Sequence, residues 1–197
     1  MKSVKIKQQQ QIKMFLGNEF GKEIGTGYFQ KQAELLKNMI IRIEGKTENQ
    51  RKTLVRTILP RIALYKVLLD KRLSKEEALI HMRKYMLNVV AAKKHASIAR
   101  MELFPGFYFV YSRAFLKIMR TTDLQISTQR CREDFYDITI TKCLWHTACV
   151  ENGCEELCGL FCDVDDVTYG GLKKIGFSRT QTLGYGGNCC DFHFYKK

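Results

Sequence analysis

The spacing of apolar residues changes beyond Thr121, and this change constrains the fold more than any other feature of the chain. Before it, apolar residues recur every three or four positions, which is the period of an amphipathic helix. After it, Phe135–Thr141, Ile175–Leu183 and Cys189–Tyr195 alternate apolar and polar residues, which is typical of half-buried strands. Helices followed by antiparallel strands predict an α+β fold, with N-terminal helices packed against a small C-terminal antiparallel sheet.

Two capping boxes mark where helices begin. In Thr47–Gln50 and in Ser74–Glu77, a hydroxyl is followed three residues later by Gln or Glu, so each side chain can bind a backbone amide of the first turn. Pro60 falls inside the apolar stripe after the first box and should kink or divide that helix. Two further helices are predicted at 29–43 and 107–119, and a loose segment at 21–27.

The remaining elements are short. A helix is predicted within Glu151–Cys162, and the three glycines of Gly184–Asn188 predict a hairpin between the last two strands. A chain of 197 residues is long enough for one domain of ordinary size. We therefore expect a single domain, 1–197, with a basic helical part at 1–120 and a cysteine-rich α+β part at 121–197.

The net charge of +13 is unevenly distributed. Residues 1–100 hold 22 Lys and Arg against 8 Asp and Glu, whereas residues 101–197 hold 11 against 12. The basic residues are spread over several predicted helices with acids among them, and no nucleic-acid-binding motif occurs. A solvated helical surface is therefore favoured over a nucleic-acid partner.

The chain shows no membrane or export signal. Its longest uncharged stretch in the apolar middle, Leu103–Ser112, is about half of what a spanning helix needs. Lysines interrupt the first 16 residues, where a signal peptide would need an apolar run. We expect a cytoplasmic protein with no membrane partner, whose 8 cysteines are reduced.

The cysteines do not follow the spacing of a structural zinc site. Cys154, Cys158 and Cys162 would share one stripe of a helix, but no C-x-x-C pair occurs anywhere. Core packing is therefore favoured over metal binding. Cys143 and His146 are the weak candidates for metal ligands.

Carboxylates and one arginine suggest chemistry near the C-terminus. Asp163, Asp165 and Asp166 lie within four residues, and close carboxylates can divide the roles of acid and base. They could equally cap a helix or face water. Arg179 could bind a substrate carboxylate or form a salt bridge with one of these acids. In the last strand, alternation places Cys190 with Phe192 and Phe194 on the core face, and Asp191 with His193 and Tyr195 on the polar face.

Three segments carry a family resemblance. Phe161–Asp163, Phe177–Leu183 and Gly186–Phe194 resemble the ending of the L-2-amino-thiazoline-4-carboxylic acid hydrolase family, and Cys143–Trp145 matches a Cys-x-Trp-like element. The match is firm over residues 158–194 and looser back to about residue 30.

The resemblance implies an enzyme that hydrolyses a carbon–nitrogen bond in a small cyclic amidine or isothiourea that bears a carboxylate. The substrate would be bound by Arg179, Thr180 and Trp145. Asp163 or Asp165 would activate water, and Asp191 or His193 would supply a proton. In a covalent version Cys162 or Cys190 is the nucleophile. In a third version a divalent metal, Mn or Zn, polarises the water, with Asp191, Asp163 and His146 as ligands.

An alternative is a sensor module without catalysis. In it the cysteine-rich half binds a small molecule or a metal, and the basic helices engage a partner. The enzyme requires a specific geometry: the terminal hairpin should turn Arg179 and Asp191 toward a cavity bordered by a loop at Asp163–Asp166.

Overall fold

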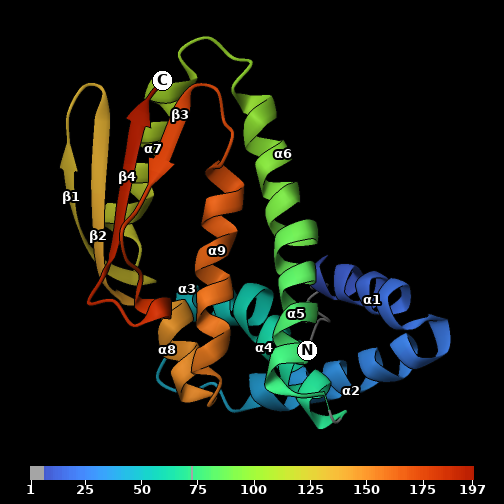
Figure 1. Ribbon diagram of the computed structural model, residues 1–197. Coiled ribbons are helices and arrows are strands. Elements are labelled where there is room, and N and C mark those ends of the chain that lie inside the picture. Colours follow the sequence, from blue (N-terminus) through green and yellow to red (C-terminus); the bar gives the residue numbers. More distant parts are fainter. Residues whose placement is uncertain (1–6, 72) are drawn as a thin grey trace. The chain divides into compact units, whose positions relative to one another are not determined.

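Every regular element that the structure describes before Thr121 is helical, and every strand lies after it, so the predicted α+β fold is confirmed. The computed structural model describes residues 7–71 and 73–197 (Figure 1). The chain divides into two compact units, 1–85 and 86–197. The single-domain organisation stays a prediction. Within the described residues, no helix combines the length and hydropathy needed to cross a membrane.

In the part of the first unit that the structure describes, 7–71 and 73–85, all regular elements are helices. Its elements are α1 (Lys7–Phe20), α2 (Lys22–Ile41), α3 (Glu48–Thr53), a π-helical segment (Leu54–Ile58), α4 (Leu59–Asp70), α5 (Lys75–Arg83) and the start of a second π-helical segment (Lys84–Ala91). The expectation of a loose segment at 21–27 is wrong beyond Gly21, because α2 already begins at Lys22. Only Gly21, with φ of 82°, interrupts the helical path between α1 and α2.

Helices α1 and α2 pack closely at Gly25. A Cβ atom at this position would lie 2.4 Å from the Leu16 carbonyl oxygen, which is backbone and cannot rotate away. The buried Gln32 follows two turns later on α2, and its amide donates to the Pro60 carbonyl of α4 at 2.9 Å. Gln32 is therefore buried with its amide hydrogen-bonded, so its burial does not leave an unsatisfied polar group.

Both capping boxes are confirmed. Thr47 and Ser74 each accept from the backbone amide three residues on, and Gln50 and Glu77 each accept from the backbone of the cap. Pro60 does not end its helix, since the chain stays helical from Glu48 to Asp70. The π-helical segment immediately before it changes the hydrogen-bond register where the proline lacks an amide.

The second unit carries the sheet. Its elements are the remainder of the second π-helical segment, α6 (Ala92–Met101), α7 (Phe107–Thr121), β1 (Gln125–Cys131), β2 (Phe135–Cys143), α8 (Leu144–Glu151), a 3₁₀ turn (Glu155–Leu157), α9 (Cys158–Tyr169), β3 (Ile175–Ser178), a 3₁₀ turn (Leu183–Tyr185) and β4 (Cys190–Lys196). The strands are antiparallel in the order β1-β2-β4-β3.

One face of this sheet packs in an aromatic core. Phe194 of β4 is fully buried, with ring centroids 4.8 Å from Tyr136, 4.9 Å from Tyr169 and 4.8 Å from Phe177. Helix α7 adds Phe107, Tyr108 and Met119 to the same cluster. Cys190 and Phe194 are buried and Phe192 packs against them, as the alternation of this strand predicts.

Several predicted boundaries are wrong. Strand β1 was not predicted, and the helix expected within Glu151–Cys162 is replaced by the end of α8, a 3₁₀ turn and the start of α9. Strand β3 ends at Ser178, so residues 179–189 form an irregular connection instead of a five-residue hairpin turn. The reason is local, because hydrogen bonds from 180 and 181 to Asp191 take the backbone out of the ladder.

Two glycines of α2 give a matched test of this packing. Gly25→Ala should destabilise the first unit by about 1–3 kcal/mol, since its methyl group meets the backbone of α1. Gly27→Ala should instead stabilise by about 0.5–1 kcal/mol, because nothing lies within 4 Å of its Cβ position and alanine is the better helix former. Urea unfolding followed by circular dichroism measures both variants. Equal effects of the same sign would contradict the close approach.

Candidate active site

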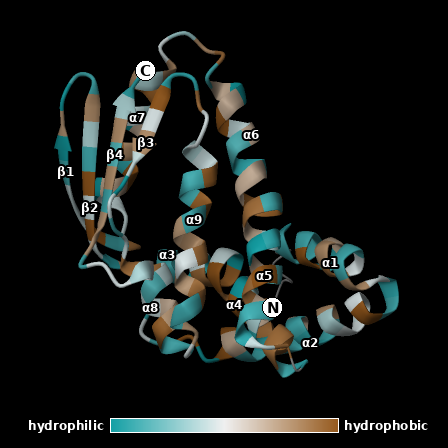
Figure 2. Ribbon diagram, in the orientation of Figure 1, coloured by the Kyte–Doolittle hydropathy of each residue, from teal (hydrophilic) through white to brown (hydrophobic). Residues whose placement is uncertain are grey.

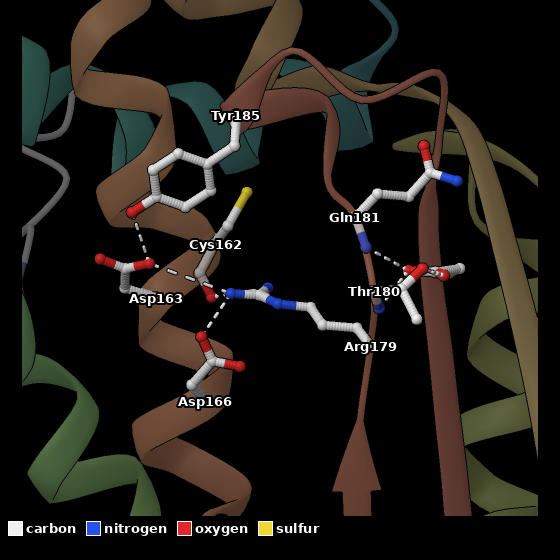
Figure 3. Close-up of polar contacts among 8 residues, drawn as sticks. Cys162, Asp163, Asp166, Arg179, Thr180, Gln181 and Tyr185 are labelled. Carbon is white, nitrogen blue, oxygen red and sulfur yellow. Dashed lines mark hydrogen bonds and ion pairs between the residues drawn. The ribbon is translucent and has the colours of Figure 1, made fainter.

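Arg179 joins the connection after β3 to helix α9. Its Nη1 donates to the Cys162 carbonyl at 3.1 Å, and its Nη2 forms an ion pair with Asp166 (Figure 3). Asp163 lies 3.9 Å from the same nitrogen. The Arg179 side chain is only 10% exposed, so these contacts are shielded from water. Of the two alternatives for Arg179, the structure therefore contains the salt bridge.

The three acids lie on a helix and not on a loop, which corrects the sequence expectation. Asp163 and Asp166 are three residues apart on α9, so both face Arg179. Burial raises the pKa of Asp166, and the neighbouring Asp163 carboxylate adds to this effect, while Arg179 opposes it. The helix forms here because the apolar residues Leu160, Phe161 and Val164 are buried.

Tyr185 closes over the Asp163 carboxylate. Its hydroxyl donates to Asp163 Oδ1 at 2.7 Å. A Cβ at position 159 would lie 2.7 Å from the Tyr185 ring, and one at position 184 would lie 2.8 Å from Cys162 Sγ. Gly159 and Gly184 thus allow the 3₁₀ turn to lie directly against α9.

Asp191 anchors the other side of the same connection. Its carboxylate accepts from the backbone amides of Thr180 at 3.0 Å and Gln181 at 2.8 Å, and from the Thr180 hydroxyl. Burial opposes ionisation, but these hydrogen bonds outweigh it and lower the pKa of Asp191. In Figure 3, Arg179 extends toward α9, whereas the backbone contacts of Thr180 and Gln181 lie on the other side of the chain. The expectation that Arg179 and Asp191 turn toward one cavity is therefore wrong.

Cys162 is the thiol with an environment for a thiolate. Contacts from the Cys158 and Cys190 thiols lower its pKa most, and the Thr182 hydroxyl and the Arg179 charge act in the same direction against burial. Cys162 is partly exposed, whereas Cys158 and Cys190 are buried. The Cys190 thiol donates toward Cys162, and this contact, together with burial, raises the pKa of Cys190. The nucleophile in thiol chemistry is the thiolate, so these contacts favour Cys162 over Cys190.

The Thr182 hydroxyl is an unusual feature of this site. Thr182 is 3% exposed, and its Oγ1 makes no hydrogen bond of ordinary geometry among the described residues, although it lies close enough to Cys162 to favour the thiolate. A buried hydroxyl without a partner costs free energy and is rare in native structures. Its position beside Cys162 makes it a donor that can serve a thiolate or a bound molecule.

All eight cysteines are free thiols. The predicted stripe of Cys154, Cys158 and Cys162 is only partly formed, because Cys154 precedes the 3₁₀ turn and only the other two lie on α9. Cys154 Sγ donates to the Cys149 carbonyl at 3.5 Å, and both residues are buried. Core packing, the favoured role, agrees with the burial of Cys149, Cys154 and Cys158.

Asp165 has a different environment from its neighbours. Burial raises its pKa to about 6, Lys94 and Arg179 oppose this shift, and Cys162 reinforces it. It is the one carboxylate of the acidic segment whose pKa is brought near the range of a general acid.

His193 lies apart from Arg179. Its Nδ1 is 2.6 Å from Asp137 Oδ1, its direct cross-strand partner on β2. Because successive residues of β4 face opposite sides, His193 shares the outer face with Asp191, while Cys190 faces the core.

The proposed metal and tryptophan positions lie on another element. Trp145 and His146 are partly exposed in the first turn of α8, and Cys143 precedes that helix. Burial raises the pKa of Cys143, although hydrogen bonds from the backbone amides of His146 and Trp145 act in the opposite direction. Within the described part of the chain, no three His, Cys, Asp or Glu side chains are arranged to hold a metal ion.

Sequence reasoning missed Thr182 and Tyr185. Both belong to the irregular connection 179–189, where no periodicity indicates which side chains face inward. A signal does exist for Tyr185, because it lies among glycines that admit close backbone approach. Thr182 follows Thr180 by two residues and gives no separate signal.

Comparison with known proteins agrees with the family resemblance. A family model described as L-2-amino-thiazoline-4-carboxylic acid hydrolase matches residues 50–194, which includes every residue of the candidate site. The match begins at residue 50 and not at about 30. No curated protein matches the chain.

One solved structure with some similarity is the Fe(II) unliganded H-NOX protein from K. algicida. It is 10% identical, and the alignment covers 96% of this chain and 94% of that chain, with a TM-score of 0.33. At that TM-score the similarity carries no argument about fold or function.

The environment of Asp165 predicts a pH-dependent effect on stability. Its folded pKa is about 6 against 3.8 for an ordinary Asp, so folding penalises its ionised form. The stability that protonation provides is complete below about pH 4 and is lost as the pH rises to about 6. Asp165→Asn should therefore stabilise the protein by about 1–3 kcal/mol at neutral pH and by much less at pH 4. Thermal unfolding across this range measures it. An effect independent of pH would contradict the desolvation of the Asp165 carboxylate.

Proposed function

Because the chain belongs to the L-2-amino-thiazoline-4-carboxylic acid hydrolase family, we propose that it opens a small cyclic amidine or isothiourea ring that bears a carboxylate. The observation that carries the proposal is the meeting of Cys162, Arg179, Asp163 and Thr182 between α9 and the connection 179–189. This arrangement supplies a nucleophile, a cation, a base and a hydrogen-bond donor within one small region.

The covalent version of the reaction fits these residues best. The Cys162 thiolate attacks the ring carbon between the two heteroatoms, and an Sγ–C bond forms. The ring carbon–nitrogen bond then breaks, and the nitrogen takes up a proton. A water molecule next displaces the thiolate, so that overall one water adds across the carbon–nitrogen bond and Cys162 is regenerated.

Neighbouring residues support both steps. Asp163 is adjacent to Cys162 in sequence and hydrogen-bonded to Tyr185, so this pair can give a proton to the leaving nitrogen in the first step and take one back from the attacking water in the second. When the ring carbon is attacked, negative charge develops on the heteroatoms bonded to it, and the Thr182 hydroxyl can donate a hydrogen bond to one of them. Asp191 fixes the connection that carries Thr182 and Arg179, and is a positioning residue in this mechanism.

Arg179 is proposed to bind the substrate carboxylate. Its partner Asp166 is 50% exposed, so a second carboxylate can approach this pair from solvent. A guanidinium has five donor hydrogens and binds carboxylates in a two-pronged geometry. The substrate anion can therefore share or replace the Asp166 contact.

Ring opening of L-2-amino-thiazoline-4-carboxylate by the full chain tests the proposal. Cys162→Ala should lower kcat by about a thousandfold or more, because it removes the nucleophile. Cys131→Ala is the matched control, since this exposed thiol lies at the end of β1 and should leave activity unchanged. Arg179→Lys should act mainly by raising KM, because lysine cannot form the two-pronged contact.

Two results would contradict this account in different ways. Full activity of Cys162→Ala together with an inactive Asp163→Asn would exclude the covalent version and leave direct attack by water. Saturable binding of the ring compound by the wild-type chain without any turnover would instead support the sensor module.

A further inference from the structure

The connection between α6 and α7 exposes large apolar side chains. Leu103 is 82% exposed and Phe104 69% exposed, and Val110 in the first turn of α7 is 69% exposed. Figure 2 shows this hydrophobic segment at the start of the connection, at the same end of the unit as the C-terminus of β4. Single exposed apolar residues are ordinary, but an adjacent pair with such exposure marks an interaction surface.

We call the exposed pair Leu103 and Phe104 the tip. The apolar surface continues from the tip into the space between α6 and α7. Residues of α6 and α7 line a hollow of about 230 Å³ whose walls are almost entirely apolar: Met101, Phe107, Val110, Tyr111, Ala114, Phe115 and Ile118. Met101 and Val110 belong both to this hollow and to the exposed surface. The tip is therefore the end of a larger apolar strip.

Basic residues surround the tip. Segments 100–110, 171–176 and 195–197 contain five Lys and Arg: Arg100, Lys173, Lys174, Lys196 and Lys197. Their single acid is Glu102, which is 6% exposed and accepts from the backbone amides of Lys173 at 2.9 Å and Lys174 at 2.6 Å. Its carboxylate faces the backbone and not the surface. The neighbouring turn between β1 and β2 adds the exposed Arg132, Glu133 and Asp134, since the Lys196 amide donates to the Asp134 carbonyl at 2.7 Å. The rim of the tip therefore remains predominantly cationic, with six Lys and Arg against two exposed acids.

The same contacts hold the tip in place. Lys174 Nζ donates to the Phe104 carbonyl at 3.1 Å, and Lys196 Nζ lies 5.1 Å from the centroid of the Phe109 ring. The apolar side chains and the cations are thus fixed to one another by Glu102 and Lys174.

We propose that this end of the second unit docks on the surface of an anionic lipid bilayer. Leu103 and Phe104 enter the boundary between headgroups and acyl chains, and the surrounding lysines stay at the level of the phosphates. A bilayer offers both an apolar interior for the tip and dense negative charge around it. The expectation of no membrane partner was based on the lack of a spanning stretch, which does not bear on surface docking. The inference is independent of the proposed hydrolase activity.

Vesicle co-sedimentation of the full chain tests the proposal. We expect binding to vesicles of phosphatidylcholine with about 30% phosphatidylserine, and loss of binding without phosphatidylserine or in about 0.5 M salt. Leu103→Ser/Phe104→Ser should lower the partition coefficient at least tenfold. The matched control Ile126→Ser/Val150→Ser also replaces two exposed apolar residues, on β1 and α8, and should leave it unchanged.

A variant that removes basic charge separates the electrostatic contribution to binding from the apolar one. Lys173→Gln/Lys196→Gln should weaken binding roughly tenfold or more, whereas Lys22→Gln/Lys37→Gln on α2 has a much smaller effect. Three results would overturn the proposal: no sedimentation with anionic vesicles, equal losses in the tip and control variants, or conversion of a dimer into a monomer by the tip variant in light scattering. The last would identify a second copy of the chain as the occupant.

Discussion

The Arg179 guanidinium connects the irregular chain after β3 to helix α9, and the arrangement of the site depends on this contact. Without a cation at this place, two carboxylates of α9 would face each other across one turn, and the Cys162 carbonyl would lose a donor. With it, the connection lies against the helix, and Thr182 and Tyr185 are brought to Cys162 and Asp163. A single buried charge therefore sets both the geometry and the electrostatics of the site.

The anchors of the connection explain which side chains meet. Asp191 holds the amides of Thr180 and Gln181, while Arg179 beside them reaches the opposite way to α9. Asp191 therefore fixes the backbone of the connection, while Arg179 is one of the groups beside Cys162. It also explains why His193, two residues after Asp191 on the outer face, pairs with Asp137 on β2 instead of joining the site.

The parts of the fold that have a regular period could be predicted from the sequence. Alternation over Phe135–Thr141 predicts that Tyr136, Ile138 and Ile140 share one face, and this face is buried; the hydroxyls of Thr47 and Ser74 indicate the starts of two helices. Parts that depend on distant contacts could not. The acidic segment Asp163–Asp166 suggested a loop, but the burial of Leu160, Phe161 and Val164 makes it helical.

The candidate site shows the same limit. Arg179 and the acidic segment could be identified from their residue types, and their salt bridge was one of two stated alternatives. The role of Thr182 could not be predicted, and the glycines around Tyr185 indicate a close approach without showing which residue it contacts, because both positions depend on the absence of a side chain at Gly159 and Gly184. Such close approaches are set by tertiary packing and leave no periodic signal in the chain.

The protonation state of Cys162 tests this account most directly. A pH titration of thiolate absorbance compares the wild-type chain with Cys162→Ala. Because the neighbouring thiols and Arg179 lower the pKa of Cys162, the account predicts that thiolate absorbance appears at a lower pH in the wild type than in Cys162→Ala. The same signal should move to higher pH in Arg179→Gln, where the stabilising charge is removed. Identical titration curves for the wild type and Cys162→Ala would contradict the central claim.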